Sequence, residues 1–124
     1  MNKPEMHFFD IFVLLLTGGT AAVIVYASLL RRDTRLFARA PLWLPTAWHL
    51  SSYMLFAFLC VLSLDSVFDT SLSLLLGGFT VATGFGALME YLQKYRPGRT
   101  PSIADALINA CGAALGALAA LTAL

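Results

Sequence analysis

The sequence predicts an all-α protein, an integral membrane four-helix bundle with short loops that occupies residues 1–124 as one membrane domain. The chain has 124 residues, of which 59% are hydrophobic, so its length allows no more than one domain. Its apolar residues form four runs, each close to the ~20 residues that a helix needs to cross a ~30 Å hydrocarbon core. The runs show no alternation of apolar and polar residues. Helices are therefore expected, because a lone helix satisfies its own backbone hydrogen bonds in lipid.

Breaks between the runs set the helix boundaries. The four predicted helices cover about residues 8–30, 47–64, 71–92 and 102–124. The charged stretch Arg31-Arg32-Asp33 ends the first helix, which reads as a retained span rather than a cleaved signal peptide. Pro41 and Pro45 are expected in the loop that follows, where a missing amide hydrogen costs nothing.

The later breaks follow the same logic. An acidic turn, Asp65 to Asp69, separates the second and third helices. Arg96-Pro97-Gly98 breaks the third helix, and Thr100-Pro101-Ser102 begins the fourth with cap-type residues and a proline in the first turn.

Charge predicts the orientation of the bundle. Most basic residues fall in loops 31–46 and 94–101, namely Arg31, Arg32, Arg35, Arg39, Lys94, Arg96 and Arg99. The positive-inside rule then places both loops in the cytoplasm and both termini outside.

Composition also excludes several classes of function. The net charge of +1 and the confinement of basic residues to loops give no case for nucleic-acid binding. Cys60 and Cys111 lie inside apolar runs without CxxC or His-rich spacing. Two buried thiols are therefore expected rather than a disulfide, and neither a metal site nor a cofactor is predicted.

Ionisable residues inside apolar segments are costly and usually face protein or water, so each one is a candidate for function. His49 and Tyr53 are four residues apart and share one face of the second helix. A histidine there is suited to proton transfer or anion binding, oriented by the phenol. The alternative is a packing histidine whose hydrogen bond is satisfied by a neighbouring helix.

Glu90 and Gln93 share one face at the end of the third helix. Glu90 lies about one turn inside the apolar region. A surface pair between Glu90 and Lys94, in the favourable order, is the alternative, although it leaves Gln93 unexplained.

Asp105 and Asn109 share one face near the start of the fourth helix. Here the alternative is strong, because Ser102-x-x-Asp105 resembles a capping box in which the acid binds the free amide of the cap residue. Asn109 is too deep in the helix to cap it and needs a partner across a helix interface.

Two further features concern the loop and the fourth helix. Arg99 is expected to pair with Glu90 or Asp105 or to bind a phosphate, unless it serves only to set topology. Gly112-x-x-x-Gly116 is a close-packing surface that predicts contact of the fourth helix with the second or third.

The polar residues together define a site hypothesis, because the two basic loops share one side of the membrane. The candidates for catalysis are His49, Glu90 and Asp105, and the candidates for ligand binding are Tyr53, Gln93, Arg99 and Asn109.

The same residues carry a resemblance to the VanZ-like family of small membrane proteins. The pattern H-x-x-x-Y, E-x-x-Q, P-x-R and D-x-x-x-N-x-x-G-x-x-x-G begins here at His49, and the resemblance covers about residues 47–117. The chain departs from the family at Ala47 and Trp48, where Asp-Lys is common, so a role that needs that lysine does not transfer. The resemblance implies a fold, a site and a bacterial cytoplasmic membrane. It does not imply a reaction. The link of its name to teicoplanin resistance suggests chemistry on the cell-wall side, whereas the charge rule places the motif in the cytoplasm.

Two functions from different classes fit these observations. In the first, the site binds or transforms an amphiphile with an anionic head: Arg99 and His49 hold the anion, and Glu90 or Asp105 acts as general base. Membrane lipids are then the partners. In the second, the protein is an accessory subunit of a larger membrane complex, and the polar residues serve only helix packing.

Overall fold

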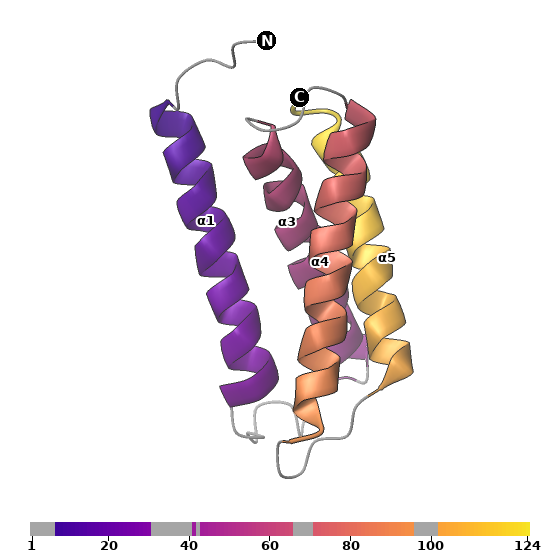
Figure 1. Ribbon diagram of the computed structural model, residues 1–124. Coiled ribbons are helices and arrows are strands. Elements are labelled where there is room, and N and C mark those ends of the chain that lie inside the picture. Colours follow the sequence, from indigo (N-terminus) through magenta and orange to yellow (C-terminus); the bar gives the residue numbers. More distant parts are fainter. Residues whose placement is uncertain (1–6, 31–40, 42, 66–70, 96–101) are drawn as a thin grey trace.

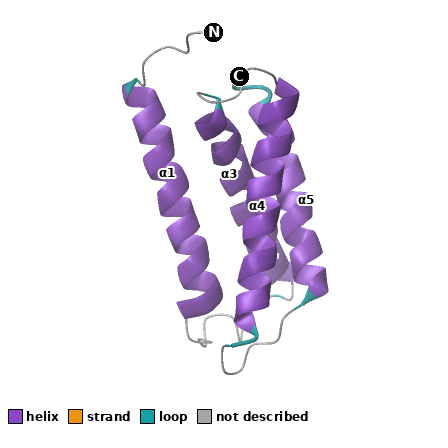
Figure 2. Cartoon of the chain, in the orientation of Figure 1, coloured by secondary structure: helices purple, strands orange, loops and turns teal. Residues whose placement is uncertain are grey.

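The protein folds into four α-helices, in agreement with the predicted all-α four-helix bundle. The structure, a computed structural model, describes residues 7–30, 41, 43–65, 71–95 and 102–124. Its elements are α1 (Phe8–Val25), the π-helical η1 (Tyr26–Leu30), α3 (Trp43–Leu64), α4 (Ser71–Gln93) and α5 (Ile103–Ala120). No strand occurs among these described residues (Figure 2). All four helices are long and apolar enough to cross a membrane, which makes this an integral membrane protein.

The helices run alternately up and down, so that functional residues distant in sequence come to the same end of the bundle (Figure 1). At that end lie η1, the start of α3, the end of α4 and the start of α5. We call it the η1 end. The start of α1 and the C-terminus of the chain lie at the opposite end.

Helix α3 is the centre of the bundle. Its most extensive contact is with α5, and it also packs against α4 and α1. Buried apolar side chains along it include Phe56, Ala57 and Cys60. Helix α1 stands at the edge of the bundle, and its buried residues are only Val13 and Ile24, which suits a helix that faces lipid over much of its surface.

The close approach of α5 to α3 depends on two glycines. A Cβ atom added at Gly112 would lie 2.5 Å from the carbonyl oxygen of Leu50, and one added at Gly116 would overlap the carbonyl oxygen of Met54. The four-residue spacing of the glycines thus matches the spacing of the α3 carbonyls that they contact. The sequence predicted contact with either the second or the third of the four helices. The structure pairs these glycines with the second, which is α3.

The N-terminal boundary of α3 corrects a sequence prediction. The predicted helix over residues 47–64 begins instead at Trp43, which places Pro45 in its first turn rather than in the loop. Proline is tolerated there because the first amide groups of a helix have no intrahelical partner.

Smaller corrections apply to the other helix ends. The predicted helix 8–30 ends as an α-helix at Val25 and continues as η1. The helix predicted over 71–92 extends to Gln93. The helix predicted over 102–124 is α-helical only from Ile103 to Ala120. At its start, Ser102 is the N-cap. At its end, the amides of residues 121–123 bond to carbonyls three residues back, as in a 3₁₀ turn.

Candidate functional site

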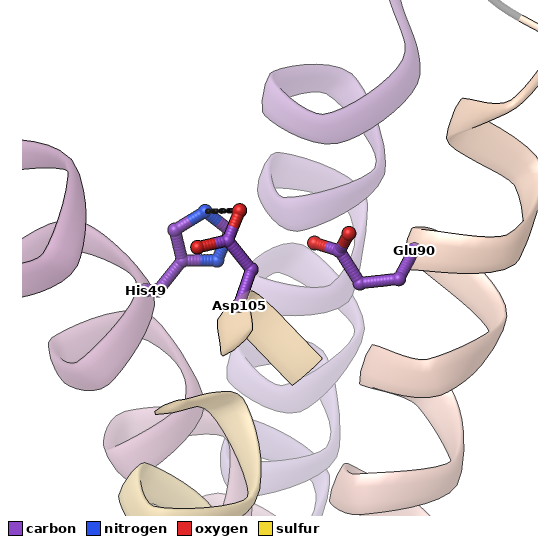
Figure 3. Close-up of side chains that lie close together, drawn as sticks. All are labelled: His49, Glu90 and Asp105. Carbon is purple, nitrogen blue, oxygen red and sulfur yellow. Dashed lines mark ion pairs between the residues drawn. The ribbon is translucent and has the colours of Figure 1, made fainter. Parts of the chain in front are cut away.

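Three ionisable side chains from three different helices converge at the η1 end. They are His49 from α3, Glu90 from α4 and Asp105 from α5, and one nitrogen or oxygen of each lies within 4.8 Å of the others. Figure 3 shows the three side chains pointing toward one another. These are the three residues that the sequence analysis gave as candidates for catalysis. We call them the His–Glu–Asp cluster.

The orientation of His49 is set by Asn109. Nδ1 of His49 lies 2.9 Å from Oδ1 of Asn109, and Nε2 lies 4.0 Å from Oδ2 of Asp105. An amide oxygen only accepts hydrogen bonds, so Nδ1 of His49 carries the proton and donates it. In the neutral imidazole, the lone pair at Nε2 is therefore presented to Asp105. Asn109, 1% exposed, has the partner across a helix interface that its depth requires.

The expected capping box at α5 forms only in part, and the departure shapes the site. The Ser102 hydroxyl accepts a hydrogen bond from the Asp105 amide at 3.2 Å, as expected. The Ser102 amide, however, donates to Oε2 of Glu90 at 3.0 Å, where a capping box would have used the Asp105 carboxylate. Because α4 supplies this acid, the carboxylate of Asp105 is available to face His49.

The burial of Glu90 argues against the alternative of a surface ion pair between Glu90 and Lys94. The side chain of Glu90 is only 5% exposed. The ammonium of Lys94 instead lies 3.7 Å from the ring centroid of Tyr91, on an exposed part of the helix. A plain surface ion pair therefore does not account for the position of Glu90.

Tyr53 lies deeper in the bundle, beside the His–Glu–Asp cluster. It is 2% exposed, and its hydroxyl has no hydrogen-bond partner within the described residues. The Glu90 carboxylate is near enough to act on it electrostatically. A buried hydroxyl of this kind is costly unless something accepts from it, so Tyr53 is a candidate donor to a bound molecule.

Gly86 is a site residue that the sequence analysis missed. A Cβ atom added there would lie 2.9 Å from Cε1 of Tyr53 and 3.2 Å from Cβ of Asn109. The absence of a side chain at Gly86 thus leaves room for both residues. The available signal was its position one turn before Glu90, on the same face of α4.

The remaining predicted ligand-binding residues are placed differently. Gln93 is buried, and its Nε2 donates to the carbonyl oxygen of Ser28 at 3.2 Å, so its amide ties α4 to η1. Arg99 lies outside the described residues, as do most of the basic loop residues.

The geometry defines a class of protein: an integral membrane four-helix bundle with a polar cluster at one end, where atoms of two carboxylates and an imidazole lie within 4.8 Å of one another. Comparison with protein-family models, curated proteins and solved structures gives no match to this chain.

Proposed function

We propose that this chain is a VanZ-like protein of a bacterial cytoplasmic membrane that binds an anionic lipid-linked or amphiphilic ligand at the η1 end. The convergence of His49, Glu90 and Asp105 from three helices carries the proposal. Helix packing alone does not require three ionisable groups so close together, and ionisable groups within membrane-spanning helices are costly unless they are used.

The charges near this end favour an anionic headgroup. Arg99 belongs to the short segment that joins α4 to α5, and further arginines belong to the segment that joins η1 to α3. Basic residues beside a membrane attract anionic lipids. The carboxylates of Glu90 and Asp105 would accept hydrogen bonds from hydroxyl or amine groups of the same headgroup.

An apolar groove supports the amphiphilic character of the ligand. It has a volume of about 550 Å³ and lies between α1 and α3, lined by side chains such as Leu15, Val23 and Leu55. Trp48 and Ser52 line it from α3, while their neighbours His49 and Tyr53 belong to the site. Between two membrane-spanning helices, such a groove fits an acyl or isoprenoid chain.

The packing of α5 bears on the alternative of an accessory subunit. Gly112 and Gly116 form a small-residue face of α5, and both contact α3 within the chain. They are therefore not available to another protein.

Native mass spectrometry of the protein, extracted gently from its own membrane, tests the proposal. We expect wild type to carry one lipid whose mass identifies its headgroup, and the double variant Arg99→Ala/Asp105→Asn to lose it. Asp65→Asn, which changes a carboxylate at the other end of α3, is the matched control and should retain the lipid. Equal lipid retention by the double variant, or a fixed place in a large complex without lipid, would contradict the proposal.

The sidedness of the site belongs to the same proposal. The charge rule supports cytoplasmic loops 31–46 and 94–101, with both termini outside. An alkaline phosphatase fused to the C-terminus should then be active and a green fluorescent protein dark. The reverse pattern would place the site on the cell-wall side.

A further inference from the structure

We propose that His49, Glu90 and Asp105 are the protein ligands of one divalent transition-metal ion of the zinc class. The inference goes beyond the proposed function and does not depend on a lipid ligand. Its starting point is that a coordinating atom of each residue lies within 4.8 Å of the others, at a point reached by three helices (Figure 3).

The orientation of His49 is the first reason. With Nδ1–H donated to Asn109 at 2.9 Å, the neutral ring directs its Nε2 lone pair toward the Asp105 carboxylate, 4.0 Å away. An unprotonated Nε2 and a carboxylate oxygen that face each other repel unless a proton or a metal ion lies between them. A histidine whose second nitrogen donates to an oxygen is the usual arrangement of a metal ligand, because that hydrogen bond selects the tautomer and raises ligand basicity.

The two carboxylates are the second reason. The Ser102 amide, 3.0 Å from Oε2, orients Glu90, and the same bond leaves the carboxylate of Asp105 available to face His49. Glu90 is nearly fully buried, so water would screen the attraction between its carboxylate and a bound cation only weakly. A divalent cation held between the three side chains would compensate both carboxylates.

The coordination geometry fits zinc with small side-chain shifts. Three protein ligands leave one position of a tetrahedral ion for water or substrate. Ligand atoms around such an ion lie about 3.3 Å apart, so separations that reach 4.8 Å here would shorten by up to ~1.5 Å. The Tyr53 hydroxyl, which has no hydrogen-bond partner in the part of the chain that the structure describes, is the group expected to donate to an oxygen in the fourth position.

The ligand set also selects the class of ion. One imidazole nitrogen with two carboxylates suits zinc, manganese or iron better than magnesium or calcium, which prefer oxygen ligands alone. This inference departs from the sequence analysis, which predicted no metal site. That prediction rested on cysteine positions and local spacing, and three ligands on three helices leave no local motif.

Metal titration tests the inference on the full chain. The protein is stripped with a chelator in detergent and titrated with Zn²⁺ in a calorimeter. We expect one ion per chain, with binding weakened at least tenfold by either His49→Gln or Asp105→Asn and unchanged by the control Asp65→Asn. Undetectable binding, or equal affinity in all four proteins, would overturn the assignment.

A second measurement keeps all three proposed ligands, so it does not depend on whether the ligand variants fold. The chain has two histidines, so ¹⁵N-histidine labelling gives two imidazoles, and His7→Gln identifies the signals of His49. We expect Nδ1 of His49 to remain protonated and its Nε2 resonance to shift when Zn²⁺ is added. An Nε2 that stays protonated at saturating Zn²⁺ would show a plain imidazolium–carboxylate pair and overturn the proposal.

Asn109 acts in this proposal as a positioning residue. Asn109→Ala retains all three ligands but removes the acceptor for Nδ1–H, and we expect about 10- to 100-fold weaker zinc binding. Asn109→Asp keeps an acceptor oxygen and should bind within about tenfold of wild type. Equal zinc affinity of wild type and Asn109→Ala would contradict this role.

Discussion

The backbone amide of Ser102 donates a hydrogen bond to Oε2 of Glu90 at 3.0 Å, so the acid that completes the start of α5 comes from α4. This bond joins the ends of two helices across a short loop. It also replaces the local bond that Asp105 would have made in a capping box, and it leaves the Asp105 carboxylate to the His–Glu–Asp cluster.

Removal of Glu90 should therefore cost more than neutralisation of its charge. Glu90→Gln keeps an oxygen that accepts from the Ser102 amide, whereas Glu90→Ala leaves that amide without its acceptor. We expect the free energy of unfolding of Glu90→Ala to fall about 1–3 kcal/mol below that of Glu90→Gln. Denaturation of both variants in mixed micelles, followed by circular dichroism, measures the difference. Equal stabilities would mean that the Ser102 contact contributes little.

Alanine substitution at two glycines should have opposite consequences. In Gly116→Ala the new methyl group meets the Met54 carbonyl oxygen, and backbone cannot move aside as a side chain can. We expect a loss of about 1–3 kcal/mol as α5 is forced from α3. Gly84→Ala is the control, since nothing lies within 4 Å of the added Cβ. It should be neutral or stabilising by up to ~1 kcal/mol, because alanine favours helix.

Tyr53→Phe separates a ligand contact from a structural one. The Tyr53 hydroxyl is buried without a partner among the described residues, so we expect its removal to leave the stability of metal-free protein unchanged or to raise it by up to about 1 kcal/mol. Zinc or lipid binding should weaken if the hydroxyl donates to a bound oxygen. A large loss of stability in the metal-free variant would instead indicate a structural hydrogen bond.

Gln93 should act at η1 and not in the His–Glu–Asp cluster. Gln93→Leu removes the donor to the Ser28 carbonyl, so amide hydrogens of residues 26–30 should exchange faster with solvent. Zinc affinity should stay within about twofold of wild type, whereas loss of a residue that orients a metal ligand weakens binding about 10- to 100-fold. Hydrogen exchange read by mass spectrometry gives the first result and calorimetry the second. Loss of zinc binding would place Gln93 in the site after all.

The sequence by itself determined the fold class and the membrane location. Four apolar runs, with Pro, Gly and charged residues between them, require helices in lipid, and this inference needs only local composition. It also identified His49, Glu90 and Asp105 as candidates, because ionisable residues stand out in apolar segments. Helix ends were less secure: Pro45 suggested a loop although the first turn of α3 tolerates it.

Only the tertiary structure decided which groups meet. Ser102 could bond to Asp105 nearby or to Glu90 on another helix, and local spacing favours the first while the packing of α4 against α5 produces the second. Likewise, Gly112 and Gly116 mark a close-packing face without naming α3 as its partner. Periodicity specifies the faces of one helix, whereas the rotation and pairing of helices depend on contacts between residues far apart in the chain.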